Sequence, residues 1–178
     1  HLSTHSVTSL EPFLEQHGLR LIDLQRVDTQ GGAAIGIAAR LGDGRTPDPS
    51  VSEARAAEVR LGLADSSGMR AFRTRVESDR DRVAEILASC GEKRIVGFGA
   101  ARSANLLVDY FELAPHLEYV VDDNAQKVGK VWNSHDIPIV PSSALTETRP
   151  DVVVCLAWIH TERITARLKE LLGGRTKI

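Results

Sequence analysis

The sequence is poor in features that mark several classes of protein. Only 4% of its 178 residues are aromatic, and its formal net charge is -2. Proteins that bind nucleic acids use clustered basic residues against phosphates and often stack bases on aromatic rings, so both values argue against a nucleic-acid partner. No apolar run is long enough to span a bilayer, and we expect no signal peptide at the start of the chain. We therefore expect neither a nucleic-acid nor a membrane partner.

Cysteine is also rare. The two cysteines, Cys90 and Cys155, lie in apolar stretches, and neither has a second metal-ligand residue at the spacing of a zinc site. We therefore predict free thiols in a reducing, cytoplasmic setting and no metal site. Hydrophobic residues make up 42% of the chain and charged residues 26%, which is ordinary for a globular protein able to bury a core.

The first 41 residues predict a helix followed by a hairpin. Residues 8–11 (Thr-Ser-Leu-Glu) have the form of a capping box, and apolar residues follow at helical spacing until Gly18. Alternation over 19–27, a turn at 29–32 and an apolar run at 33–41 predict two antiparallel strands. One helix and one hairpin are too little for a domain, so we interpret them as the trailing edge of a larger one.

Residues 42–92 predict a linker with long helices. Glycine, proline and aspartate dominate 42–50, which is typical of a linker. Helical patterns follow at 51–61 and 66–90, and the second is a mostly charged rod with one apolar stripe that ends at Gly91. Such a helix can bridge two lobes or pack on a partner.

From residue 93 to 178, strands alternate with helices. This order predicts an α/β domain built on a Rossmann-like, doubly wound parallel sheet. The apolar run at 151–158 is typical of a strand that is covered on both faces. The predicted strands are 94–99, 117–123, 137–140 and 151–158, the predicted helices are 101–113, 142–148 and 161–172, and 173–178 could start a last strand.

The loop after the first of these strands is the main candidate for a ligand site. Gly97 allows a tight turn, Gly99 allows close backbone approach, and free N–H groups at the start of the next helix would attract an anion. Arg102 stands where a dinucleotide fingerprint has its third glycine, and its bulk would crowd a pyrophosphate held in the usual manner. Glycines that serve only a tight turn are an equally good interpretation of this pattern.

Ligands of such sheets bind at the carboxyl ends of the strands, so the loops at 97–105, 122–130 and 158–161 should converge. An aspartate after the second strand could hold a ribose hydroxyl, although Asp-Asp-Asn is also ordinary turn chemistry and the lysines at 127 and 130 could be merely solvated. The predicted ligand-binding residues are Gly97, Gly99, Ala100, Arg102, Ser103, Asn105, Asp122, Asp123, Lys127, Trp158 and His160.

Several short motifs, taken in order, resemble one family. Residues 1–37 resemble the close of the catalytic domain in S-adenosylmethionine-dependent C-methyltransferases that act on nucleotide-linked deoxysugars. The segments GFGA, VDDNAQKVGK, IPIV and LAW resemble, in this order, the marks of that family's C-terminal Rossmann-like domain. The sequence departs from the family at Gln30, where a histidine is common, and at Arg102-Ser103, which replaces a small residue and a lysine.

The resemblance implies a C-terminal part of an enzyme that moves a methyl group from S-adenosylmethionine to a sugar carbon of a nucleotide-linked keto-deoxysugar. The implied division is 1–41 for the tail of the catalytic domain, 42–92 for the linker, and 93–178 for a Rossmann-like domain that helps to bind the nucleotide diphosphate-sugar. His1 matches the family's catalytic histidine, and an imidazole suits removal of a carbon-bound proton because its pKa lies near neutrality.

The resemblance also implies that the N-terminal zinc and S-adenosylmethionine domains are partners outside this chain, which would be inactive alone. Two alternatives stay open on the sequence. One is a stand-alone NAD(P)- or nucleotide-binding module, which the aspartate after the second strand favours and Arg102 disfavours. The other is a scaffold domain without a ligand, which uses its charged helix for self-association.

Overall fold

The computed structural model describes residues 4–63, 65–132 and 135–178. The chain divides into two compact units, His1–Val76 (unit 1) and Glu77–Ile178 (unit 2), and each is described by itself. None of the described helices is both long enough and apolar enough to cross a membrane. The division into 1–41, 42–92 and 93–178 drawn from the family resemblance stays a prediction.

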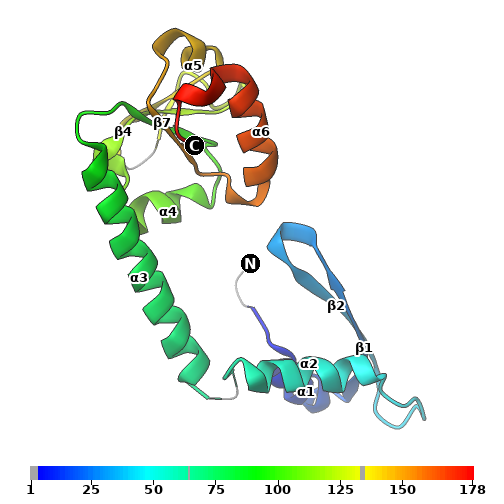
Figure 1. The fold of residues 1–178 in the computed structure, drawn as a ribbon. Helices are drawn as coiled ribbons and strands as arrows, with labels where there is room; N and C mark the ends of the chain where they lie inside the picture. Colours follow the sequence, from blue (N-terminus) through cyan, green and yellow to red (C-terminus); the bar gives the residue numbers. More distant parts are fainter. Residues whose placement is uncertain (1–3, 64, 133–134) are drawn as a thin grey trace. The chain divides into compact units, whose positions relative to one another are not determined.

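Unit 1 contains the predicted helix and hairpin. Helix α1 (Val7–Gln16) leads into β1 (Leu19–Val27), which pairs antiparallel with β2 (Ala33–Arg40) through a short 3₁₀ turn, η1 (Thr29–Gly31). Helix α2 (Pro49–Arg60) packs with α1 against β1 (Figure 1). The core is small and consists of Val7, Leu21, Val51 and Ala54, with Leu14 and Leu24 packed against it.

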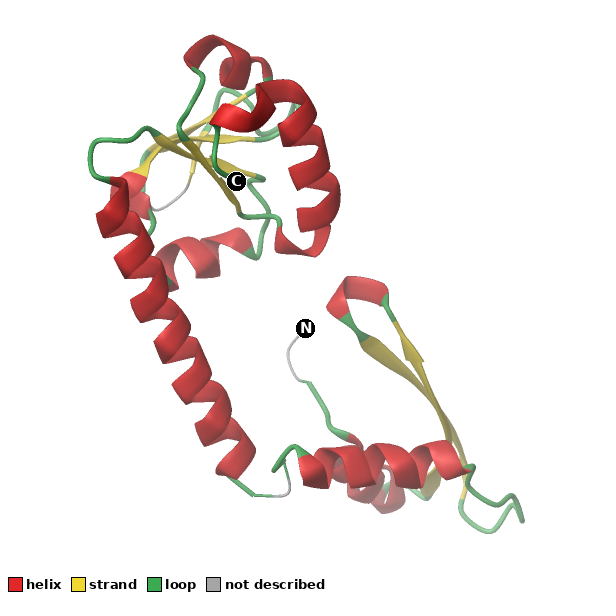
Figure 2. Cartoon of the chain, in the orientation of Figure 1, coloured by secondary structure: helices red, strands yellow, loops and turns green. Residues whose placement is uncertain are grey.

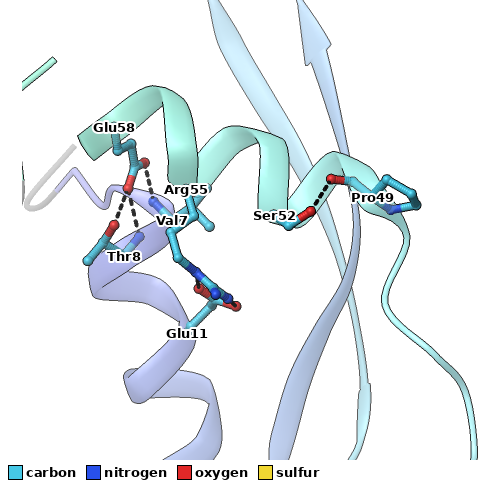
Figure 3. A network of polar contacts seen from close by, with 7 residues as sticks. All are labelled: Val7, Thr8, Glu11, Pro49, Ser52, Arg55 and Glu58. Atoms are coloured by element: carbon cyan, nitrogen blue, oxygen red, sulfur yellow. Dashed lines mark hydrogen bonds and ion pairs between the residues drawn. The ribbon is translucent and has the colours of Figure 1, made fainter. Parts of the chain in front are cut away.

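The start of α1 differs from the predicted capping box at residues 8–11. Ser6 is the N-cap: its hydroxyl accepts the Ser9 N–H at 3.2 Å, and the Ser9 hydroxyl accepts the Ser6 N–H at 3.1 Å. This local cap is joined by a tertiary one, because the Glu58 carboxylate of α2 accepts the N–H groups of Val7 at 2.5 Å and Thr8 at 2.8 Å (Figure 3). The predicted box is therefore wrong, and the helix begins earlier.

Glu58 joins the two helices of unit 1 as a charged cap. It also accepts a hydrogen bond from the Thr8 hydroxyl at 2.6 Å, and one turn away Arg55 pairs with Glu11 (Figure 3). Partial burial raises the pKa of the Glu58 carboxyl, but the hydrogen bonds from Thr8 and Val7 outweigh burial and leave the pKa below its ordinary value. A carboxylate at this position also complements the positive end of α1.

Unit 2 is the predicted α/β domain, and its five-stranded, mostly parallel sheet fits a Rossmann-like fold. The strand order is β5-β6-β4-β3-β7, and only β5 runs antiparallel to its neighbour. Figure 2 shows this sheet among the helices of the unit. The strands are β3 (Ile95–Phe98), β4 (Leu117–Val121), β5 (Val131–Trp132), β6 (Ile137–Val140) and β7 (Val152–Cys155).

Alternate residues of the strands supply two separate cores. Ile95 and Val120 face one side, where they pack with Leu87 and Cys90 of α3 (Ser67–Cys90) and with α4 (Ala104–Tyr110). On the other side Val96, Phe98, Tyr119, Val121 and Val153 pack with α5 (Ser143–Thr148) and α6 (Thr161–Leu172). Because one face carries α3 and α4 and the other carries α5 and α6, the sheet is covered on both sides.

Several boundaries in unit 2 differ from the predicted ones. Helix α4 occupies 104–110 instead of 101–113 and is followed by η2 (Ala114–His116). Strand β7 ends at Cys155, and η3 (Trp158–His160) follows it where the prediction continued the strand to 158. The end of the chain forms η4 (Gly173–Arg175), and the expected last strand is limited to one bridge between Val152 and Lys177.

Candidate functional site

The two glycines of the predicted loop serve close packing inside unit 2. A Cβ atom on Gly97 would lie 2.8 Å from Leu156 Cδ1 and 3.0 Å from Val120 Cγ2. Gly99 has a φ of 97°, and a Cβ atom there would lie 2.6 Å from Ala157 Cβ and 3.1 Å from Ala157 N. The space that the missing side chains leave is therefore filled by the chain after β7 and by β4, which favours the tight-turn interpretation of these glycines.

The first three amides after Phe98 are engaged within the chain. The N–H of Gly99 donates to Val121 O at 2.7 Å, that of Ala100 to Asp122 Oδ2 at 2.9 Å, and that of Ala101 to Gly99 O at 2.8 Å. Helix α4 begins only at Ala104 and has 7 residues. These three N–H groups are therefore not available to an anion.

Asp122 and Lys127 form an internal brace. Asp122 Oδ1 accepts the Asn124 N–H at 2.8 Å, and Asp122 Oδ2 lies 3.0 Å from Lys127 Nζ in addition to its bond with Ala100. Lys127 Nζ also donates to Ala100 O at 2.9 Å. The Asp122 side chain is only 13% exposed. Asp122 ties the glycine loop to the turn after β4, so its carboxylate oxygens are already occupied and are poorly available to a ribose hydroxyl.

Asp123, Trp158 and His160 take no part in this brace. Asp123 pairs with Arg167 of α6, whose guanidinium carbon is 5.9 Å from the centre of the Phe98 ring. The hydrogen bond from Arg167 lowers the pKa of the Asp123 carboxyl in spite of its partial burial. Trp158 is 50% exposed and His160 is also exposed.

A cavity of about 460 Å³ lies between the glycine loop and the segment that leads into β5. Of the predicted residues it brings together Ala100, Arg102, Asn105 and Lys127. It does not include Gly97, Gly99, Ser103, Asp122, Asp123, Trp158 or His160. Two of the three expected loops therefore meet at this cavity, whereas 158–161 does not line it.

The cavity has a cationic wall. Arg102, Lys127 and Lys130 line it, and no carboxylate is among its lining residues. In the described part of the chain, Arg102 and Lys130 have no ion-pair partner, whereas Lys127 is held by Asp122. Uncompensated cations around a hollow favour an anionic ligand. The amides of Asn105 and Gln126 add hydrogen-bonding groups to the same wall.

Six of the ten lining residues were not among the predicted ligand-binding residues. The residues not predicted are Ala101, Gln126, Lys130, Val131, Trp132 and Ile139. Strand β5 has only 2 residues, too few for a periodic pattern to reveal it. Trp132 was the available signal, since it is one of two tryptophans and follows a turn-rich segment. The indole N–H of Trp132 donates to Asn105 Oδ1.

A larger hollow of about 640 Å³ lies at the opposite edge of the sheet, where β7 begins. Arg149, Pro150 and Asp151 line it together with the end of α6. We place the candidate site at the smaller cavity, because ligands of parallel sheets bind at the carboxyl ends of the strands and because the uncompensated cations gather there. Within the described ranges no three potential metal ligands cluster, and His1 lies outside them.

Comparison with known proteins adds an independent finding. The sequence model of the family described as "C-methyltransferase C-terminal domain" matches residues 28–178. C-methyltransferase NovU of Streptomyces niveus is 30% identical over 180 aligned residues, which cover 98% of this chain and 43% of NovU. The chain thus spans less than half the length of this relative.

Proposed function

Because the chain belongs to the C-methyltransferase C-terminal domain family, we propose that it is the C-terminal part of an enzyme that transfers a methyl group from S-adenosylmethionine to a sugar carbon of a nucleotide-linked keto-deoxysugar. In this proposal unit 2 helps to bind the nucleotide diphosphate-sugar, and His1 is the candidate base. The helix and hairpin of unit 1 are the tail of the catalytic domain. S-adenosylmethionine and zinc belong to domains outside this chain.

The observation that carries this proposal is the cationic wall of the 460 Å³ cavity. A diphosphate is the strongly anionic part of the proposed substrate, and Arg102 and Lys130 are cations without a carboxylate partner in the described part of the chain. A guanidinium suits phosphate oxygens because its N–H groups form a planar fork, and an ammonium adds a point charge. The amides of Asn105 and Gln126 suit the remaining oxygens of the ligand.

The same geometry argues against a dinucleotide held in the usual manner. That mode needs a free carboxylate for the ribose and an open approach to the glycine backbone. Here Asp122 is engaged by Ala100, Asn124 and Lys127, and Gly99 packs on Ala157. These contacts support the nucleotide-sugar over the NAD(P) alternative.

The binding half of the proposal is tested by calorimetric titration of the chain with UDP, dTDP and NADH. We expect Arg102→Ala and Lys130→Ala each to weaken the nucleoside diphosphate by roughly 5- to 20-fold, the effect of losing a charge-assisted hydrogen bond. The matched controls are Arg163→Ala and Lys169→Ala, exposed cations of α6 outside the cavity. Tighter binding of NADH than of either diphosphate, or equal losses in the controls, would contradict the proposal.

The chemical half is tested in the complete enzyme. Methyl transfer from S-adenosylmethionine should slow in the Arg102→Ala variant through a raised KM for the nucleotide-sugar, with the KM for S-adenosylmethionine unchanged. A change confined to S-adenosylmethionine would place that cofactor at this cavity and would refute the assignment.

A further inference from the structure

Trp132 and Asn105 meet at the wall of the cavity. Trp132 is 5% exposed, and its indole N–H donates to Asn105 Oδ1 at the start of α4. An indole nitrogen can only donate, so it must face the oxygen of the Asn105 amide and not the nitrogen. The Nδ2 amino group of Asn105 is therefore left as a donor, and no described residue accepts a hydrogen bond from it.

A second contact supports the placement of Trp132. His135 Nε2 lies 2.6 Å from Asp109 Oδ1, four residues along α4 from Asn105. Residues four apart lie on the same face of a helix, so the chain around β5 is joined to one face of α4 at two points. This double attachment fixes the indole against Asn105.

The groups around Asn105 indicate what its free amino group would meet. Arg102 and Lys130 line the same cavity without a carboxylate partner in the described part of the chain, whereas Lys127 is engaged by Asp122 and by Ala100 O. We propose that Trp132 is a positioning residue that holds the Asn105 amide with its N–H groups toward a diphosphate, which Arg102 and Lys130 bind directly. This inference rests on the proposed function and adds a neutral donor to the anion site.

The test is calorimetric titration of the full chain with UDP and with inorganic pyrophosphate. Trp132→Phe keeps an aromatic ring and removes the indole N–H, so the Asn105 amide is no longer held. Asn105→Asp keeps an oxygen for the indole but replaces the amide donor by a carboxylate. We expect each variant to weaken UDP by about 5-fold or more, the effect of a lost donor to a charged group. Tyr110→Phe, which also keeps an aromatic ring and lies outside the cavity lining, should stay within about 2-fold of the wild type.

A double-mutant cycle separates positioning from general stability. If Trp132 acts through Asn105, Trp132→Phe should weaken UDP no further in an Asn105→Ala background. Thermal unfolding of each variant identifies any that fails to fold. Asn105→Asp stays informative even if Trp132→Phe does not fold, because it leaves the buried indole in place.

The outcomes distinguish this inference from the proposed function. A wild-type chain that binds neither UDP nor pyrophosphate overturns both. A wild-type chain that binds UDP, with Asn105→Asp binding equally well, overturns only the donor role of Asn105. Equal and additive losses from Trp132→Phe and Asn105→Ala would overturn the positioning role of Trp132.

Discussion

Replacing Gly99 by alanine tests the packing that closes the glycine loop. Two costs are expected. Alanine at a φ of 97° is strained by roughly 1 to 2 kcal/mol. Its Cβ atom would also lie 2.6 Å from Ala157 Cβ and 3.1 Å from Ala157 N, and forced overpacking of this kind costs about 1 to 3 kcal/mol. Gly99→Ala should therefore lower the free energy of unfolding of unit 2 by roughly 2 to 5 kcal/mol.

Gly129 provides the matched control. Its φ is 82°, and a Cβ atom placed there would have nothing within 4 Å. Gly129→Ala therefore carries the backbone strain without the steric clash, and it should cost only roughly 1 to 2 kcal/mol. The difference between the two variants isolates the close approach of Gly99 to Ala157.

Urea unfolding followed by tryptophan fluorescence measures this difference. The sequence has two tryptophans, Trp132 and Trp158, and both belong to unit 2, so the emission reports this unit alone. Ala157→Gly in the Gly99→Ala background should recover part of the loss, since it removes the nearer of the two clashing atoms. If Gly99→Ala costs no more than Gly129→Ala, the loop is open, and a ligand held against the glycine backbone becomes tenable again.

Two further variants test the charged contacts of each unit. Glu58→Gln should destabilise α1 by about 1 kcal/mol, as measured by hydrogen exchange of the first amides of α1. Glu53→Gln, at an exposed position on the same helix as Glu58, is the control and should have no effect. Because the pKa of Glu58 is lowered in the folded state, the stabilisation that Glu58 provides is present above its unfolded pKa and is lost as the pH falls through its folded pKa. The first amides of α1 should therefore lose protection from hydrogen exchange below about pH 4.5 in the wild type but not in the Glu58→Gln variant. Lys127→Met should reduce the stability of unit 2 by about 1 to 2 kcal/mol because it removes the partner of Asp122, whereas Lys130→Met should reduce UDP affinity and leave stability within about 0.5 kcal/mol. The reverse pattern would show that the two lysines had been assigned each other's roles.

Long elements with one clear period could be predicted from the sequence. Strand β1 and helix α6 have the bounds that their apolar spacing indicates, 19–27 and 161–172. In α6, Ile164 and Leu168 repeat with the helical period and face a core, so local pattern and tertiary packing agree. In β1, Leu21 faces the core of unit 1, and Leu24 packs against that core beyond a register irregularity at Leu21/Asp23. The α/β class of unit 2 follows from the order of such elements, which explains why it was predicted correctly.

Boundaries set by distant residues could not be predicted in this way. Helix α1 starts at Val7, where Ser6 and Ser9 cap it locally and Glu58 accepts its first N–H groups. Nothing near residue 7 indicates Glu58 as a partner. Helix α4 starts at 104, and in the loop before it the Ala100 N–H donates to Asp122 Oδ2. In both cases a carboxylate far along the chain accepts N–H groups at or just before the helix start, through strong hydrogen bonds that no local pattern indicates.

The candidate site illustrates the same limit for function. A strand followed by Gly-x-Gly is compatible with a phosphate clamp and with tight internal packing, because both need the same freedom of the backbone. What separates them is the residue that fills the space beside Gly99, and that residue is Ala157, at the end of another strand. Because Ala157 occupies the space beside Gly99, the part of the loop that remains accessible is the part that lines the cavity, where Arg102 lies with Lys130 and Asn105. The departure from the dinucleotide fingerprint at Arg102 is then consistent: a residue that would obstruct one mode of binding supplies the charge for the other.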